Sequence, residues 1–246
     1  MTSVRIRFLG SGDAFGSGGR LQTCILVESN GLSCLIDCGA SSLIALKGAG
    51  VDPNEIDTVL VSHLHGDHFG GLPFLVLDGQ FSGRSNHLRI GGPPGLRART
   101  TEAMEVFFPG SSRARRKFEV QFQELPDAVP TRVGPLRVTP YEVVHACGAP
   151  PYALRIEING RIVAYSGDTE WTDRLIAAAS GADLFICESY FYEKQVPFHL
   201  NYSTLMQHRS ALDCKRIVLT HMSSDMLSRL SELEVQAAHD GFEIVL

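Results

Sequence analysis

Residues 63–68 read His-Leu-His-Gly-Asp-His, so three imidazoles and one carboxylate fall within six positions. The apolar run 57–62 comes directly before this hexapeptide. Its β-branched residues and short length predict a buried strand. A histidine-rich surface loop is the alternative interpretation, and the buried strand argues against it. The chain therefore has to fold so that a polar cluster lies at the end of a core strand.

The spacing inside the hexapeptide is suited to two metal ions. On an extended backbone, side chains two positions apart point to the same side, so His63 and His65 can share one ion. Gly66 allows the chain to turn, which would direct Asp67 and His68 toward a second position. Neutral imidazoles and carboxylates suit zinc, and also manganese or iron. We expect two divalent metal ions, with zinc as the first expectation.

Three further strand-like runs each end in a potential ligand. They cover residues 138–144, 161–167 and 216–220, and they are followed by His145, Asp168 and His221. Open sheets gather their active sites just past the carboxyl ends of strands. Taken singly, each of these residues is more often a turn or cap residue. Together with the hexapeptide they complete a set of five histidines and two aspartates, which fits two metals bridged by Asp168.

At this point the chain resembles the metallo-β-lactamase fold of dinuclear metallohydrolases. The hexapeptide and its three downstream partners match in order and spacing, and residues 7–12 and 35–39 match the first strands and turns. The resemblance covers essentially the whole chain and no ligand position departs from it. It implies an α+β fold, a four-layer αββα sandwich, in a single hydrolase domain spanning residues 1–246.

The resemblance also assigns the ligands. It implies that one metal is held by His63, His65 and His145, the other by Asp67, His68 and His221, with Asp168 between them. Asp67 is counted among the catalytic residues as well. Between two cations, a water loses a proton near neutral pH and becomes a bridging hydroxide nucleophile. This nucleophile could attack either a phosphoryl or a carbonyl group.

Periodicity alone predicts mixed α and β structure. Strand-like runs cover residues 6–9, 24–28 and 33–37, and further strands are expected near Phe118, Leu136, Leu154, Ile162 and Leu184. Helices are expected over residues 41–47, 72–77, 96–107, 204–212 and 227–237. The first of these helices begins with Ser41, a residue able to cap a helix. No low-complexity segment or linker interrupts the chain.

The composition is that of an ordinary globular protein. At 246 residues, with 44% hydrophobic and 20% charged residues, the chain suits one large domain. The formal net charge of −5 gives no strong field for nucleic acid, so an anionic substrate must be attracted locally by the metals. The basic run 113–117 could contact phosphates, although a solvated loop is the simpler interpretation.

The sequence predicts a soluble cytoplasmic enzyme. Residues 1–7 lack the apolar segment of a signal peptide, and no stretch reaches 18 apolar residues, so no membrane partner is expected. The six cysteines form no Cys-x-x-Cys pair and lie mostly in apolar runs, which indicates reduced, buried thiols. The sequence leaves open whether the chain forms a homodimer.

Two features bear on the substrate, and the first is the surroundings of His145. Thiolesterases and many lactonases of this fold place their third histidine in a Gly-His-Thr-x-Gly turn. Here the segment 143–148 reads Val-Val-His-Ala-Cys-Gly. This segment is similar instead to ribonuclease Z and the phosphodiesterases close to it. The resemblance therefore favours phosphodiester substrates over thioesters, lactones or lactams.

The second feature is the pair Glu188 and His199. In the ribonuclease Z group, a glutamate in the matching strand orients a histidine from the following loop, and that histidine protonates the leaving oxygen. Glu188 and His199 match these positions, although Cys187 stands where the family usually has histidine. An expelled alkoxide benefits from a proton donor, and a neighbouring carboxylate favours the protonated imidazole.

We therefore predict a phosphodiesterase, either ribonuclease Z-like or acting on a small cyclic phosphodiester. Ribonuclease Z carries a long arm for transfer RNA, and the segments 108–117 and 129–135 are too short for one. A small substrate, as in the phosphodiesterase of the carbon–phosphorus lyase pathway, fits equally well. A carbonyl hydrolase is the alternative. A non-catalytic relative would be expected to lose a ligand, and all seven are present.

Overall fold

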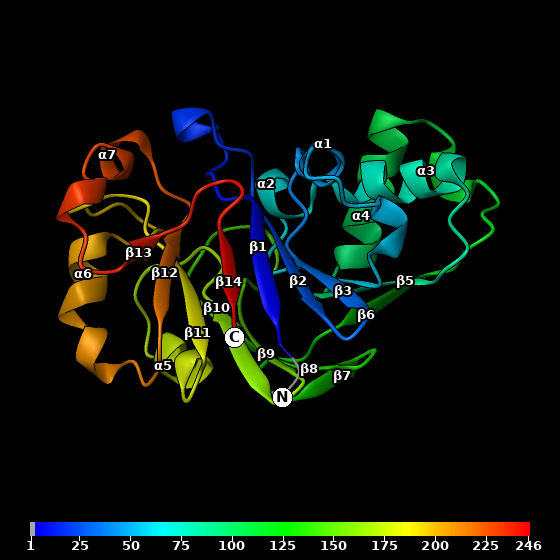
Figure 1. The fold of residues 1–246 in the computed structure, drawn as a ribbon. Helices are drawn as coiled ribbons and strands as arrows, with labels where there is room; N and C mark the ends of the chain where they lie inside the picture. The colour runs from blue at the N-terminus through cyan, green and yellow to red at the C-terminus, as the bar shows by residue number, and fades with distance from the viewer. Residues whose placement is uncertain (1–2) are drawn as a thin grey trace.

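The computed structural model describes residues 3–246 and has four layers (Figure 1). Two seven-stranded sheets pack face to face, and helices cover the outer face of each sheet. This arrangement confirms the predicted αββα sandwich. Residues 1 and 2 of the predicted domain span lie outside the described residues. Within the described part, no helix is long and apolar enough to cross a membrane.

The first sheet runs in the order β14 (Glu243–Val245), β1 (Arg5–Gly10), β2 (Cys24–Ser29), β3 (Leu32–Ile36), β4 (Thr58–Leu60), β5 (Leu88–Gly92) and β6 (Val120–Glu124). The second runs in the order β13 (Gln236–Ala237), β12 (Ile217–Thr220), β11 (Leu184–Glu188), β10 (Arg161–Tyr165), β9 (Tyr152–Ile158), β8 (Leu136–Glu142) and β7 (Thr131–Val133). The first sheet is covered by α1 (Ser42–Gly48), α2 (Gly66–Phe69), α3 (Leu72–Ser82) and α4 (Leu96–Phe107). The second is covered by α5 (Arg174–Ala179), α6 (Tyr202–Gln207) and α7 (Ser224–Leu227).

Both faces of the central strands are buried, which explains their nearly continuous apolar sequences. Successive side chains of a strand point to opposite faces. In β2, Ile25 and Val27 face the core between the sheets, whereas Leu26 faces the helices. In β11, Ile186 faces the inner core and Phe185 the outer one. Each sheet thus contributes to two cores, and burial fixes the strand register.

The sheet topology gathers the candidate site. Strands β3 and β4 are parallel, and so are β10, β11 and β12. The carboxyl ends of parallel strands meet at one edge, and the segments that follow them carry the polar residues. His63, Asp168 and His221 follow β4, β10 and β12, and Glu188 is the last residue of β11. The fold therefore concentrates these groups along one edge of the sandwich.

Two helix predictions are wrong in their details. Ser41 does not cap α1 through its side chain, because its hydroxyl accepts a hydrogen bond from the Gln22 amide at 2.9 Å. The predicted helix 227–237 does not form. Instead α7 ends at Leu227, a 3₁₀ turn covers Leu230–Glu232, and β13 extends the second sheet beside β12. Edge pairing there outweighs the helical periodicity.

Two other boundaries differ from the sequence interpretation. The expected helix 204–212 is α6, which begins where the Asn201 side chain accepts from the Thr204 amide, and a 3₁₀ turn follows it. The run 138–144 leaves the sheet early, since β8 ends at Glu142. The Val144 amide donates to the Thr169 hydroxyl instead of to a strand. His145 therefore lies on a loop three residues past the strand.

Candidate metal centre

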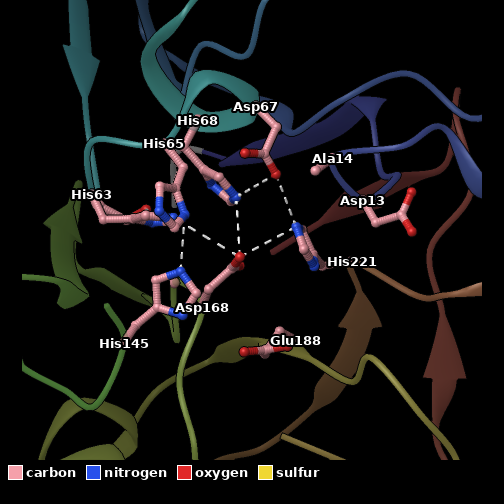
Figure 2. A network of polar contacts seen from close by, with 12 residues as sticks. Asp13, Ala14, His63, His65, Asp67, His68, His145, Asp168, Glu188 and His221 are labelled. Carbon is pink, nitrogen blue, oxygen red and sulfur yellow. Dashed lines mark hydrogen bonds and ion pairs between the residues drawn. The ribbon is translucent and has the colours of Figure 1, made fainter. Parts of the chain in front are cut away.

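The structure brings all seven predicted ligands together (Figure 2). They form two groups, and within each group the ligand atoms lie within 4.8 Å of one another. The groups are His63, His65 and His145, and Asp67, His68, Asp168 and His221. The resemblance implies the same two sets of ligands, and the predicted bridge Asp168 lies in the second group.

In the first group, His63 and His145 each have a polar partner at Nδ1. His63 is fully buried, and its Nδ1 lies 3.0 Å from the Ser62 hydroxyl, which leaves Nε2 directed into the cluster. His145 donates from Nδ1 to the Phe198 carbonyl at 2.8 Å. In the neutral imidazole, Nε2 is then the nitrogen without a proton, and it lies 3.0 Å from Nδ1 of His65. Two imidazole nitrogens this close need a shared cation or proton between them.

Asp168 occupies the centre of the cluster. Its Oδ2 lies 3.3 Å from His221 Nε2, 3.4 Å from His68 Nε2 and 3.9 Å from His63 Nε2. Figure 2 shows Asp168 with dashed lines that reach both groups. Asp67 Oδ2 lies 3.1 Å from His68 Nε2 and 3.2 Å from His221 Nε2. A carboxylate within reach of both groups is suited to bridge two ions.

Sequence reasoning missed Asp37, which positions His68. The Asp37 carboxylate is fully buried and accepts hydrogen bonds from His68 Nδ1, the Ser62 amide and the Ser62 hydroxyl, each at 2.7 Å. The bond to Nδ1 fixes the tautomer that presents Nε2 to the cluster, as carboxylates behind metal ligands do. The position of Asp37 at the end of a strand run, like that of Asp168, is the signal that could have found it.

Several polar atoms of the cluster fit a metal better than any protein partner. Among residues 3–246, His63 Nε2 and Asp168 Oδ1 are buried without a hydrogen-bond partner, and buried His68 Nε2 lies near two carboxylates but forms no well-aligned hydrogen bond with them. A buried polar atom left unsatisfied costs about 1–3 kcal/mol. Ligation of a divalent ion would satisfy all three, and the mixture of imidazole and carboxylate is one that zinc, manganese and iron accept. The donor set therefore fits two such ions.

Burial and neighbouring charges set the ionisation of the cluster. Burial lowers the pKa of His63 well below its usual value, reinforced by the charge of His68, and burial also lowers the pKa of His145. Burial would raise the pKa of Asp168, yet His221 and His68 hold it well below its usual range. The pKa of His221 rises to about 9, because Asp168 and Asp67 outweigh its burial. Protonated histidines are thus favoured beside ionised aspartates. A metal ion that binds these histidines would replace their protons and release them.

Glu188 and His199 form a second feature beside the ligands. His199 Nδ1 lies 3.1 Å from the Oε2 of Glu188, and the Glu188 side chain is fully buried. Burial would lower the pKa of His199, but its hydrogen bond to Glu188 and the charge of that carboxylate raise it. Burial and the nearby Asp168 raise the pKa of Glu188. The structure thus brings the predicted pair into contact. His199 Nδ1 also lies 4.0 Å from Asp168 Oδ2.

A cavity of about 200 Å³ opens onto the cluster. His65, Asp67, Asp168, His199 and His221 line it together with Ala14, Phe15 and Tyr190. Tyr190 stacks on His199 with ring centroids 4.8 Å apart and so supports the imidazole from one side. The Phe15 ring is 85% exposed at this cavity. His199 therefore reaches the same cavity as the candidate ligands.

Three of the six non-glycine residues with positive φ in the described part of the chain lie at this site. Asp37, Phe198 and His221 have positive φ values of 57°, 71° and 56°. Non-glycine residues rarely adopt this left-handed conformation, and such strain tends to persist where the surrounding structure fixes a functional geometry. All three residues hold or contact a candidate ligand, so the strain accompanies the site.

The comparisons with known proteins agree with this geometry. A family model described as the anti-Pycsar protein Apyc1 matches residues 4–239. The ribonuclease Z of Anoxybacillus flavithermus is 25% identical over 297 aligned positions, which cover 97% of this chain and 93% of that protein. Two solved structures are similar in fold. The Bacillus subtilis metallo-beta-lactamase fold protein YhfI has a TM-score of 0.79 at 23% identity, covering 99% of this chain and all of that one. The short form of human tRNase Z has a TM-score of 0.79 at 24% identity, covering 98% of this chain and 98% of that one.

Fold and site together define a metal-dependent hydrolase of the metallo-β-lactamase fold. Because the family model matches nearly the whole chain, the chain belongs to the family of the anti-Pycsar protein Apyc1. Its curated relatives include ribonuclease Z proteins, to which it is less than 30% identical.

Proposed function

We propose that this protein is a dinuclear metal-dependent phosphodiesterase that acts on a small cyclic or linear phosphodiester. The observation that carries the proposal is the contact between buried Glu188 and His199 at 3.1 Å, beside the central Asp168. A phosphodiesterase that expels an alkoxide gains from a placed proton donor.

The seven clustered residues would hold two divalent ions. We assign them as His63, His65 and His145 for one ion, Asp67, His68 and His221 for the other, and Asp168 as the bridge. When bound, the ions would supply an activated water and neutralise charge on the phosphate. Zinc is our first expectation, with manganese and iron as alternatives. Asp37 and the Phe198 carbonyl would keep His68 and His145 directed at the ions.

The protein's own acid would be His199. Its Nδ1 contacts Glu188, so Nε2 is the ring nitrogen left to donate a proton, and His199 is one of the residues that line the cavity. The raised pKa keeps part of the imidazole protonated at neutral pH. The proton on Nε2 would then pass to the leaving oxygen as the ester bond breaks. Glu188 would act through His199 by holding its orientation and charge.

Several observations favour a small substrate over transfer RNA. The relative from Anoxybacillus flavithermus aligns over 297 positions, more than the 246 residues of this chain, so the ribonuclease Z protein has segments that this chain lacks. The basic run 113–117 does not contribute to the cavity beside the candidate ligands. Within that run, Arg116 donates to the carbonyls of Ser111 and Ser112, which gives it a local structural contact.

We also propose that the protein works in the cytoplasm, since all six cysteines are free thiols and five of them are buried. A reducing compartment suits such a set. The proposed compartment and the proposed small substrate are both independent of the metal chemistry. The two proposals can therefore be tested separately.

The proposal is tested by a substrate screen on protein whose metal content has been measured. Bis-p-nitrophenyl phosphate and cyclic nucleotides represent phosphodiesters, and a thioester and a lactone represent the carbonyl alternative. We expect hydrolysis of the phosphodiesters, its loss after chelation, and its return when zinc or manganese is added. Hydrolysis of the thioester or lactone alone would instead support the carbonyl hydrolase.

A further inference from the structure

Residues 196–199 form a tight turn that carries the candidate acid. Val196 and His199 pair across it, Pro197 is its second residue, and Phe198 is its third, with φ of +71°. A positive φ at the third position is the mark of a type II turn, where glycine or asparagine is preferred. Phenylalanine at this position is unfavourable by itself. Contacts outside the turn must therefore stabilise it.

Two hydrogen bonds hold Phe198 in this conformation. Its amide donates to Oε1 of Glu170 at 2.8 Å, and its carbonyl accepts from His145 Nδ1 at 2.8 Å. The amide belongs to the peptide group whose rotation distinguishes type II from type I turns. The bond to Glu170 therefore selects the orientation that the strained turn requires. The same residue, Phe198, thus connects Glu170 to a candidate metal ligand and directly precedes His199.

Packing does little to fix this segment. Residues 193–195, 197 and 198 are exposed. A cavity of about 230 Å³, lined by Glu170, Val196 and His199 among others, lies beside the turn. A segment with few buried contacts depends on its hydrogen bonds for its position. The bond from Glu170 is thus more important here than it would be in a packed core.

Glu170 is itself firmly placed by the chain around it. It follows Asp168 and Thr169 directly. Its amide donates to the Val144 carbonyl at 3.1 Å, and the Thr169 amide donates to Glu188. The segment 168–170 therefore contacts the loop of His145, the carboxylate of Glu188 and the turn before His199. Such a segment can transmit the position of one of these groups to the others.

We propose that Glu170 is a positioning residue that couples the metal ligand His145 to the proton donor His199 by holding the turn at Phe198. The role of His199 as donor rests on the proposed phosphodiesterase function, whereas the orientation of His145 does not. The prediction is that loss of the Glu170 acceptor loosens one metal position and misplaces the acid, while the fold remains intact.

The test uses matched variants at saturating zinc. Glu170→Ala should lower kcat roughly 10- to 100-fold on a cyclic nucleotide, less than the full loss of a general acid, and far less on bis-p-nitrophenyl phosphate. Glu170→Gln keeps an oxygen acceptor and should stay near the wild type. Adding Phe198→Gly to Glu170→Ala removes the strain of the turn and should restore part of the activity. Glu193→Ala is the control, because Glu193 is exposed on the same loop and forms no hydrogen bond within residues 3–246.

A second readout does not depend on activity. Competition with a zinc chelator should give Glu170→Ala a weaker affinity for one of the two ions, by at most the roughly 10- to 100-fold that removing the direct partner of a ligand costs. If the alanine variant does not fold, both measurements are repeated on Glu170→Met, which keeps the side-chain length but not the acceptor.

The coupling is overturned by unchanged zinc affinity, by an equal loss of kcat on both esters, or by no recovery with Phe198→Gly. If the wild type cleaves no phosphodiester, the proposed function fails and the zinc competition alone decides the role of Glu170.

Discussion

Replacement of His199 by alanine tests whether this imidazole is the general acid. Its Nδ1 lies 3.1 Å from a fully buried carboxylate of Glu188, and burial, which would lower its pKa, is outweighed by that partner. The wild-type imidazole is therefore protonated to a useful extent above its ordinary pKa of about 6.5. Loss of a general acid slows a reaction roughly 10²- to 10⁴-fold. This factor corresponds to about 3–5 kcal/mol of transition-state stabilisation.

The assay compares two esters that differ in their leaving group. A cyclic nucleotide expels a ribose alkoxide, which needs a proton, whereas bis-p-nitrophenyl phosphate expels a phenolate that departs readily without one. We expect His199→Ala to show the full loss of kcat on the cyclic nucleotide and a much smaller loss on the phenolate ester. Glu188→Gln should show the same pattern more mildly, because the imidazole remains. His87→Ala is the control, since His87 is an exposed histidine paired with Glu119 away from the cavity.

Two results would contradict the role of His199 as the general acid. An equal loss on both esters would mean that His199 binds or orients the substrate, and it would remove the main reason for preferring phosphodiesters over carbonyl substrates. A loss of bound metal in His199→Ala would mean that this histidine is a ligand, since it lies only 4.0 Å from Asp168.

Three further outcomes follow from the structure. Asp37→Ala should weaken zinc binding roughly 10- to 100-fold in a chelator competition, because it removes the acceptor behind His68, and an unchanged affinity would contradict that role. Activity on the cyclic nucleotide should fall as pH rises through the raised pKa of His199, since the acid form is lost there, and Glu188→Gln should move this limb to lower pH; identical limbs would argue against the pair. Phe8→Ala empties a fully buried position between the sheets and should lower the free energy of unfolding by about 3–5 kcal/mol in urea, and a loss below about 1 kcal/mol would mean that the inner core repacks.

The candidate ligands could be predicted from sequence because each follows an apolar run. His63, Asp168 and His221 come one to three residues after β4, β10 and β12, so strand patterns and the parallel-sheet rule bring them together. The layers could not be predicted from periodicity, since strands buried on both faces lack alternation. They came from the resemblance. The failed helix at 227–237 shows the same limit, because pairing of β13 with β12 is a tertiary contact.

The contacts of the supporting groups could not be predicted, because these contacts join distant segments. Asp37 is 31 residues from His68, and Phe198 is 53 residues from His145. Nothing near Glu170 in the sequence indicates that it accepts a bond from Phe198, 28 residues away. A phenylalanine in a left-handed conformation also runs against local preference. Such contacts can be identified only once the loops at the sheet edge have been placed in three dimensions.

The dinuclear centre is tested most directly by a metal count on protein reconstituted with excess zinc, combined with anomalous scattering from its crystals. We predict two ions per chain, about 3.5–4 Å apart, with the Asp168 carboxylate in contact with both. Asp168→Ala should then weaken the binding of both ions, and His221→Ala chiefly one. A single ion in the wild type, or equal losses from the two substitutions, would contradict the dinuclear centre bridged by Asp168.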